Sequence, residues 1–290
     1  MRVAVVGHVE WVQFACVERL PERGEILHAG AYFEAAAGGG AVAAAQLARL
    51  AGGATLFTAL ADDELGERAA AELARHGVEV HAALRRQRAQ RRAFTHLDGG
   101  GERTITVLGE RLGPVGDDAL PWELLDGVDG VYFTAGDGAA LRQARRARVV
   151  VATPRAHQAI GEVGVEAGSA VGAGAAPLDA LVLSGGDADE RRWAVGVTPQ
   201  PPLTVFTEGA RGGHFASAAG RTTTYEAAHP PGPPVDSYGC GDAFAAGLTF
   251  GLASGLEDAA AIALATRCGA VCLTGRGPYG RMLSAAELGA

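Results

Sequence analysis

The chain contains no lysine, and all 25 of its basic residues are arginine. This absence excludes a Walker A phosphate loop, because that loop needs a lysine directly after its glycines. It also excludes the strand lysine of protein kinases and any lysine that forms a Schiff base with a substrate. A phosphate bound to this protein must therefore be held by backbone N–H groups, arginines, helix termini or a metal ion.

Cysteines and long apolar runs are scarce too. The four cysteines are Cys16, Cys240, Cys268 and Cys272. The last two lie one helical turn apart and could share a metal, but no Cys or His pair with zinc spacing accompanies them, so we interpret them as small core residues. No apolar run is long enough to span a membrane, and residues 1–7 are too short for a signal peptide. We therefore expect a cytoplasmic protein with no membrane partner and no disulfides.

A length of 290 residues and a hydrophobic fraction of 48% suit one large α/β domain or one domain with a small extension. The net charge of −8 argues against a nucleic-acid partner. The one basic run, at 85–92, has three interpretations: nucleic-acid binding, a solvated strand or subunit contact, and an arginine that reaches a phosphate or carboxylate of a substrate. The net charge favours the second.

Short apolar segments alternate with helical ones along the chain. Strands are predicted at 2–7, 54–60, 128–134, 148–152, 179–184 and 203–206, and a hairpin at 94–97 and 104–108. Helices are predicted at 41–50, 66–76, 243–253 and 258–271. This order is typical of an α/β fold. A dinucleotide-binding fold is excluded because Gly7 is followed by neither a G-x-G-x-x-G pattern nor a helix start.

The most informative stretch is 233–247, in which two prolines precede a glycine-rich turn, Asp242 and a predicted helix. Gly239 and Gly241 let the backbone turn sharply with its N–H groups pointing inward. The helix adds the positive end of its macrodipole. Together these features predict an anion site.

Two roles are open for Asp242 on this pattern. A carboxylate at a helix N-terminus can cap the helix, and one beside a phosphate site can accept a proton from an attacking hydroxyl. Phe244, Gly247, Leu248 and Gly251 share one face of the helix, so the glycines allow close packing on its neighbours. A helix held in this way suits a catalytic role.

Three consecutive glycines, Gly38, Gly39 and Gly40, precede the first predicted helix. They form either a loop that leads into an amphipathic helix or a close backbone approach to a polar ligand. Both interpretations stay open at this stage.

The segment 236–247, Asp-Ser-Tyr-Gly-Cys-Gly-Asp-Ala-Phe-Ala-Ala-Gly, resembles the C-terminal signature of the ribokinase family of phosphofructokinase-B type sugar kinases. The resemblance implies an α/β fold: a three-layer αβα sandwich with a mainly parallel central sheet and a small β lid. It implies a single domain over 1–290, with the lid contributed by about 10–36 and 84–110.

The same resemblance implies an ATP-dependent phosphotransferase. Such an enzyme moves the γ-phosphate to a hydroxyl of a sugar, a nucleoside or a related small molecule. Asp242 would be the base, and its turn, with Gly239, Cys240 and Gly241, would be the anion hole.

On the acceptor side, Glu10 stands where the family has the asparagine of a Gly-x-x-Asn-x-Asp stretch, and Trp11 could stack on a sugar or base. The glycines Gly38, Gly39 and Gly40 fall in the family's N-terminal signature. Val12, Val42 and Ser184 depart from the family's polar residues at the matching positions.

The nucleotide and metal residues follow from the resemblance alone. The expected nucleotide ligands are Ser184, Thr207, Gly209, Arg211, Gly212 and Gly277. Asp187 would order Mg²⁺ through a water, and Asp236 would lie near a monovalent cation such as K⁺. Helix capping by Ser184 or Asp187 is the alternative.

Two functions therefore stay open. The first is the kinase. The second is a ligand-binding or regulatory protein that kept the fold and lost efficient catalysis, which the changes at Val12, Val42 and Ser184 support and the intact Asp242 turn opposes. The family's lids often pair between subunits, so the resemblance also implies a homodimer through the lid.

Overall fold

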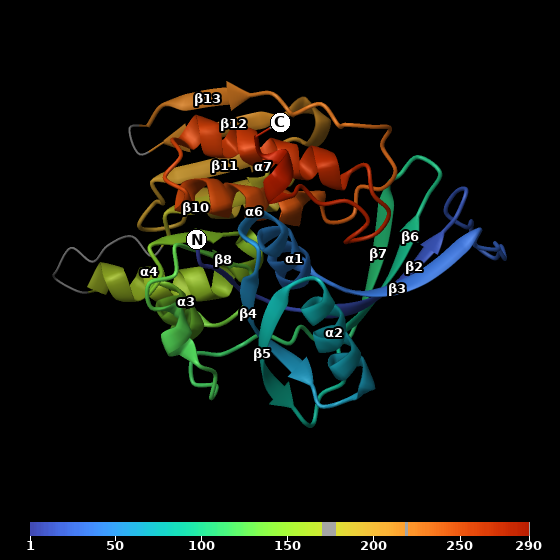
Figure 1. The fold of residues 1–290 in the computed structure, drawn as a ribbon, viewed down its shortest axis with the longest axis horizontal. Helices are drawn as coiled ribbons and strands as arrows, with labels where there is room; N and C mark the ends of the chain where they lie inside the picture. The colour runs from blue at the N-terminus through green and yellow to red at the C-terminus, as the bar shows by residue number, and fades with distance from the viewer. Residues whose placement is uncertain (170–177, 218–219, 290) are drawn as a thin grey trace.

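The computed structural model describes residues 1–169, 178–217 and 220–289. In this part of the chain a nine-stranded sheet carries helices on both faces, and a four-stranded sheet stands beside it (Figure 1). The large sheet has the order β13-β12-β11-β10-β9-β8-β1-β4-β5. The bounds in that order are Thr222–Tyr225, Gly213–Ser217, Leu203–Thr207, Ala180–Ser184, Val149–Ala152, Gly130–Phe133, Val3–Val6, Ala54–Ala61 and Val78–Arg85.

The large sheet is parallel from β5 to β11, and only the pairs β11–β12 and β12–β13 are antiparallel. β1 lies between β4 and β8. The chain adds β4 and β5 on one side of β1 and then β8 to β11 on the other, so the strand order reverses beside β1. Such a switch point leaves a crevice at the carboxyl ends of the strands, where α/β proteins bind ligands.

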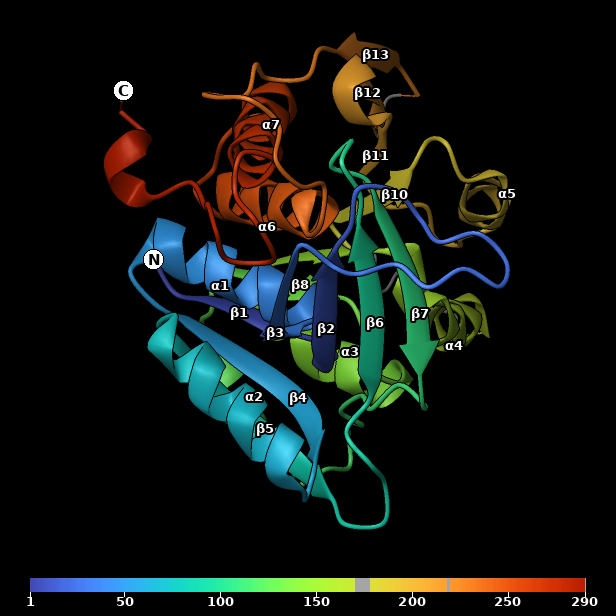
Figure 2. The same cartoon turned by 90° about the vertical axis from the view of Figure 1, so that its right-hand side faces the viewer.

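The large sheet has a hydrophobic core on each of its two faces, and successive residues of a strand contribute to them in turn. Val3 and Val5 pack into one core and Ala4 and Val6 into the other, because successive side chains of a strand point to opposite faces. α1, α2, α6 and α7 cover the first core, and α3, α4 and α5 cover the second, which gives three layers (Figure 2). In chain order the bounds of α1 to α7 are Gly39–Ala51, Glu64–Arg75, Gly138–Ala144, His157–Ser169, Ala188–Val195, Cys240–Ala253 and Asp258–Cys272.

The smaller sheet, which we call the lid sheet, has the order β3-β2-β6-β7. Its strands are Ala31–Ala37, Glu10–Cys16, Arg92–Leu97 and Arg103–Leu108. The Phe14 ring stacks on Phe33 with centroids 4.6 Å apart and meets the Tyr238 ring edge-on at 4.9 Å. Because Tyr238 belongs to the loop before α6, the lid sheet packs against the segment that leads into α6.

The glycines of α6 allow a close contact with α7, as the sequence predicted. A Cβ at Gly247 would lie 2.7 Å from Cys268 Sγ, and one at Gly251 would lie 2.9 Å from the Ala261 Cα. Overpacking of such a contact costs about 1–3 kcal/mol. α6 is therefore held in one position against α7.

The predicted strands and helices agree with the structure except at their ends. The helix predicted at 66–76 begins at Glu64, because Asp63 caps it by accepting a hydrogen bond from Gly66 N at 2.9 Å. The helix predicted at 243–253 begins at Cys240, so Asp242 lies in its first turn. None of the helices in the described part of the chain has the length and apolar composition that a bilayer crossing requires.

The basic run at 85–92 is not a strand of its own, so the prediction of a solvated strand is wrong, and the alternative of a subunit contact stays a prediction. The run comprises the end of β5, a turn and the first residue of β6. Four of its arginines have carboxylate partners: Arg85 with Asp118, Arg86 with Asp62, Arg88 with Glu110, and Arg91 with Glu10. Much of the positive charge of this run is therefore neutralised within the chain.

Candidate active site

The switch point beside β1 is closely packed by glycine. Gly7 directly follows β1 and Thr134 directly follows β8. A Cβ at Gly7 would lie 2.6 Å from Thr134 Cγ2 and 2.8 Å from the Gly40 Cα. The first turn of α1 is therefore pressed against the ends of both central strands.

The N-terminus of α6 is open. Gly239 has φ 81°, in the left-handed region that favours glycine. The first helical bond is from Ala243 N to Gly239 O at 2.8 Å, and within the described residues the N–H groups of Gly241 and Asp242 donate to no protein acceptor. Free N–H groups at the positive end of a helix dipole form an anion site.

Asp242 does not cap its own helix. Its Oδ1 accepts a hydrogen bond from Arg155 Nη1 at 2.8 Å, and Arg155 lies in the turn Pro154–Ala156 after β9. The charge of Asp242 raises the pKa of Arg155, so the guanidinium stays charged. The Asp242 side chain is 13% exposed, and it can therefore be reached by a small molecule.

The glycine segment before α1 meets this carboxylate. A Cβ at Gly39 would lie 2.8 Å from Arg155 Nη1, 3.0 Å from Thr134 Oγ1 and 3.1 Å from Asp242 Oδ1. Both interpretations of this segment stay open, because Gly39 and Gly40 form the first turn of α1 and the same turn lies close to the Asp242 carboxylate. The N-termini of α1 and α6 therefore meet at one carboxylate.

Glu10 lies at the start of β2, where the chain enters the lid sheet. Its Oε1 is 3.0 Å from Arg91 Nε and 3.4 Å from His8 Nε2. Burial lowers the pKa of His8 from its ordinary value of 6.5, so the ring is neutral at pH 7. A Cβ at Gly38 would lie 3.2 Å from Glu10 Cγ, so two of the predicted acceptor residues lie side by side.

Tyr238 lies close enough to the carboxylates of Glu10 and Asp242 to be affected by both charges. Burial raises its pKa, and the charges of Glu10 and Asp242 raise it further. Burial and the charge of Asp242 also raise the pKa of Tyr132 in β8. Both phenols therefore stay neutral beside the site.

Trp11 points away from this cluster, because adjacent residues of a strand face opposite sides. Its Nε1 donates to Glu34 Oε2 at 3.1 Å, and the Arg68 guanidinium lies 4.3 Å from the centroid of its ring. The structure gives Trp11 a packing role on the side facing α2 and does not bring it to the acceptor residues.

The loop predicted to hold the nucleotide follows β11, at the same edge of the sheet as Asp242. Thr207 ends β11, and Gly209 and Gly212 adopt φ of 61° and 80° around a short turn. Arg211 in that turn is exposed and pairs with Glu208 at 3.4 Å. The contact uses only Nε of the guanidinium, and its other donors are directed to no acceptor among the described residues.

Ser184 ends β10, and Asp187 caps α5. Asp187 Oδ1 accepts hydrogen bonds from Asp189 N at 2.9 Å and Glu190 N at 3.1 Å. No group of three or more His, Cys, Asp or Glu side chains suited to a metal occurs in the described ranges. A single carboxylate oxygen, Oδ2 of Asp187, fits an Mg²⁺ ion that keeps its waters and binds mainly to phosphates.

Asp236 ties two loops together. Its Oδ1 accepts a hydrogen bond from Tyr238 N and its Oδ2 one from Gly277 N, both at 2.6 Å. Gly277 has φ 68°, and a Cβ there would lie 2.7 Å from the Phe33 ring. Gly277 therefore packs against the lid sheet, and the cation and nucleotide roles of these two residues stay predictions.

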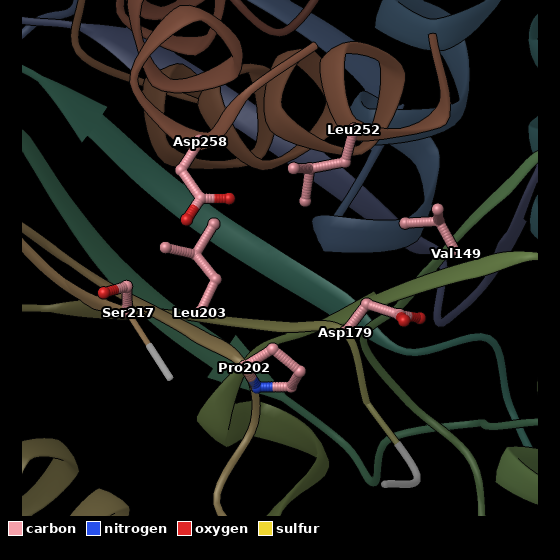
Figure 3. Close-up of a pocket in the computed structure, with 7 residues that line it drawn as sticks. All are labelled: Val149, Asp179, Pro202, Leu203, Ser217, Leu252 and Asp258. Carbon is pink, nitrogen blue, oxygen red and sulfur yellow. The ribbon is translucent and has the colours of Figure 1, made fainter. Parts of the chain in front are cut away.

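A pocket of about 390 Å³ opens at the opposite edge of the large sheet (Figure 3). Val149 and Leu203 begin β9 and β11, and Asp179 directly precedes β10, so the pocket lies at the amino ends of these strands. Ligands of parallel sheets bind at the carboxyl ends. We therefore do not place the function in this pocket.

The sequence of the site lies within a region shared with known kinases. The sequence model of the pfkB family carbohydrate kinases matches residues 1–161 and 193–284. The chain belongs to the pfkB family. This agrees with the resemblance found in residues 236–247.

Solved structures show the same fold. Ribokinase from Arabidopsis thaliana, complexed with ribose and ATP, superposes with a TM-score of 0.73 at 16% identity, covering 99% of this chain and 96% of its own. Ribokinase from Giardia lamblia gives 0.76 at 14% identity, with coverage of 99% and 97%. Adenosine kinase from Sinorhizobium meliloti gives 0.73 at 19%, with 99% and 98%. No curated protein matches the sequence. The predicted ribokinase-like sandwich is confirmed.

Four residues that lie in this candidate site were missed by sequence reasoning: His8, Arg91, Arg111 and Arg155. Arg91 lies in the basic run, and one interpretation of that run did include an arginine that reaches a substrate. Nothing local marks Arg111 or Arg155 among 25 arginines, because the partners of both are distant in the sequence.

Proposed function

We propose that the protein is an ATP-dependent kinase that transfers the γ-phosphoryl group to a hydroxyl of a sugar, a nucleoside or a related small molecule. The observation that carries the proposal is the environment of Asp242. Its carboxylate does not cap α6, is partly exposed, and lies beside unpaired N–H groups at a helix terminus. A carboxylate needed only for folding would have no reason to face an anion site.

The chemistry follows from this arrangement. An alcohol is a poor nucleophile, so Asp242 accepts its proton as the oxygen forms a bond to the γ-phosphorus and the bond to the ADP oxygen breaks. Within the turn from Gly239 to Asp242, the unpaired N–H groups of Gly241 and Asp242 stabilise the charge that spreads over the phosphoryl oxygens. Such donors are worth about 3–4 kcal/mol each, and a positioned base about 10²–10⁴ in rate.

The nucleotide is assigned to the carboxyl ends of β10 and β11, near Ser184, Thr207 and the turn from Gly209 to Gly212. Asp187 would hold Mg²⁺ through a water, and bound Mg²⁺ would neutralise phosphate charge. Activity in potassium, sodium and choline chloride at equal ionic strength tests the cation expected near Asp236. Equal rates in all three salts would remove that cation from the proposal.

The test of the proposal is Asp242→Asn. We expect the variant to fold, with a free energy of unfolding within about 1 kcal/mol of the unsubstituted protein, because the pair with Arg155 is partly exposed. We expect kcat to fall on the order of 10²–10⁴-fold. Asp258→Asn is the matched control: Asp258 is also in the first turn of a helix but lies at the opposite edge of the sheet. Undiminished turnover in Asp242→Asn would remove this residue from the mechanism.

The second candidate, a ligand-binding or regulatory protein, is favoured by the apolar contacts of the changed positions. Val12 is fully buried, and a Cβ at Gly239 would lie 3.0 Å from Val42, so neither side chain presents a polar anchor. ATP consumption with a panel of sugars and nucleosides separates the two functions. Saturable acceptor binding without ATP consumption would favour the binding protein.

A homodimer through the lid sheet also belongs to this proposal. Ile105, Val107 and Leu108 of β7 are exposed apolar side chains on an edge strand of the lid sheet. Such an edge can pair with another chain. Light scattering after size-exclusion chromatography tests this expectation, and a monomer at micromolar concentration would contradict it.

A further inference from the structure

Two arginines lie where the chain crosses between the two sheets, and a third lies beside them at the end of a strand of the large sheet. Arg91 directly precedes β6, Arg111 follows β7, and Arg155 follows β9. Arg111 Nη1 donates a hydrogen bond to the Arg155 backbone oxygen at 3.0 Å. Arg91 Nε lies 3.0 Å from Oε1 of Glu10, which opens β2. Glu10, Arg91 and Arg111, which lie where the chain enters or leaves the lid sheet, therefore form one charged cluster with Arg155 beside the Asp242 site.

The charges in this cluster do not balance. Arg91 pairs with Glu10, and Arg155 pairs with Asp242 at 2.8 Å. Arg111 has no carboxylate partner within the described part of the chain; it donates only to a backbone oxygen. Burial and the positive charges of Arg91 and Arg155 lower the pKa of Arg111, which reflects the crowding of like charges. Three guanidinium groups thus face two carboxylates.

Buried polar atoms around the cluster also lack partners. His8 Nδ1 and Thr134 Oγ1 are buried and make no hydrogen bond among the described residues. Buried polar groups are rarely left without a partner. Thr134 Oγ1 lies beside the Gly39 position and the His8 ring beside the Gly38 position, so a water or a polar group of a ligand is needed there to complete the bonding.

The cluster and the base lie within the reach of one small molecule. A Cβ at Gly38 would lie 3.2 Å from Glu10 Cγ, and a Cβ at Gly39 would lie 3.1 Å from Asp242 Oδ1. Consecutive Cα atoms are only about 3.8 Å apart. A molecule of sugar size can therefore touch the arginines beside Glu10 at one end and Asp242 at the other.

We infer that the phosphoryl acceptor carries an anionic group, a carboxylate or a phosphate, that binds Arg111 and Arg91 while its hydroxyl lies at Asp242. The inference rests on the proposed kinase function and adds the class of acceptor. Guanidinium groups suit both anions, because their planar donors match paired oxygens. A neutral sugar leaves the positive charge of Arg111 without a counter-charge, whereas an anionic sugar supplies a negative charge that pairs with it.

The test compares acceptors that differ only in the anionic group. ATP consumption is measured with glucose, gluconate and glucose 6-phosphate, and with further neutral sugars and their matching acids and phosphates. We expect kcat/KM to be at least about tenfold higher for an anionic member than for its neutral partner. Preference for the acid or for the phosphate identifies which anion the site takes.

Arg111→Gln is the decisive variant, because this residue is exposed and its loss leaves no buried carboxylate unpaired. We expect kcat/KM for the anionic acceptor to fall about 10–100-fold, mainly through KM, as for the loss of a hydrogen bond to a charged group. Arg111→Lys is expected to restore part of this loss. Arg86→Gln, in the basic run but paired with Asp62 at the surface, is the matched control and leaves the preference unchanged.

Three outcomes would overturn the inference. One is a neutral acceptor used as well as its anionic partners. Another is an Arg111→Gln variant that loses the same factor with neutral and anionic acceptors. The third is an Arg111→Gln variant whose loss lies in the KM of ATP, which would assign Arg111 to the donor phosphates. Absence of ATP consumption with every acceptor would instead contradict the proposed function itself.

Discussion

A substitution at Gly39 is expected to reduce activity strongly while changing stability little. Gly39 is the first residue of α1, and its φ lies outside the left-handed region, so alanine fits its backbone. The added methyl group would lie 2.8 Å from Arg155 Nη1, 3.0 Å from Thr134 Oγ1 and 3.1 Å from Asp242 Oδ1. The perturbation Gly39→Ala therefore places one carbon at the centre of the proposed site.

The expected effect on stability is small. The nearest atom belongs to the end of a flexible arginine side chain that is 44% exposed and free to withdraw. Exchange of glycine for alanine in a helix is favourable by about 0.5–1 kcal/mol, which offsets part of the crowding. We expect the free energy of unfolding to change by no more than about 1 kcal/mol in urea denaturation.

The expected effect on activity is large. Withdrawal of Arg155 disturbs its pair with Asp242, and the methyl group takes space that the acceptor hydroxyl needs. A misplacement of about 1 Å at a reacting centre can cost about 10² in rate. We therefore expect kcat/KM to fall about 100-fold in an assay that couples ADP release to a dye.

Two glycine variants calibrate this result. Gly40→Ala would place its methyl 2.6 Å from the His8 backbone oxygen, which cannot move away, so we expect a loss of about 1–3 kcal/mol in stability. Gly161→Ala in α4 meets no atom within 4 Å and should leave activity unchanged. Full activity of Gly39→Ala, or a loss of stability as large as that of Gly40→Ala, would refute the assignment of Gly39 to the site.

Two other predictions concern stability. Burial lowers the pKa of His76 and of His8 below the ordinary value of 6.5, so the unfolded chain binds more protons than the folded one at acidic pH. The free energy of unfolding should therefore fall as the pH drops below about 6.5. The His76→Gln variant should show a smaller fall between pH 7.5 and 5.5, and an unchanged slope would contradict this prediction. Asp236 accepts hydrogen bonds from the backbone N–H groups of Tyr238 and Gly277, and Asp236→Asn leaves one of the two without its acceptor oxygen. Chemical denaturation should therefore show a loss of about 1–3 kcal/mol in the free energy of unfolding. An unaltered midpoint would show that these two hydrogen bonds contribute nothing to stability.

The absence of lysine agrees with the architecture of the site. Positive charge comes from Arg91, Arg111 and Arg155, and the remaining donors are backbone N–H groups at the start of α6. Guanidinium groups keep their charge when crowded and partly buried, whereas a lysine in such surroundings loses its proton more readily. An arginine-only site is therefore suited to hold anions at the base of the lid sheet.

Some of the sequence predictions failed for reasons that are local in character. Trp11 was assigned to the acceptor because its ring could stack on a sugar or base, yet it adjoins Glu10 on a strand, where neighbours face opposite sides and only one of them can face the site. The run at 85–92 was interpreted as a solvated strand or a subunit contact, but it comprises the end of β5, a turn and the first residue of β6, and its arginines pair with carboxylates from other segments. In both cases the sequence pattern did not show which side chains face the site and which contact other segments of the chain.

The sequence by itself determined the elements and the chemistry that depends on near neighbours. The glycine turn, the helix that follows it and Asp242 lie within a few residues of one another, so backbone geometry and the helix dipole act there whatever the rest of the chain does. Only the tertiary structure decided which arginines lie beside Glu10 and Asp242, because strand order and the crossings into the lid sheet bring Arg91, Arg111 and Arg155 there. Charge pairing over such separations depends on distance in space, and the sequence does not carry that distance.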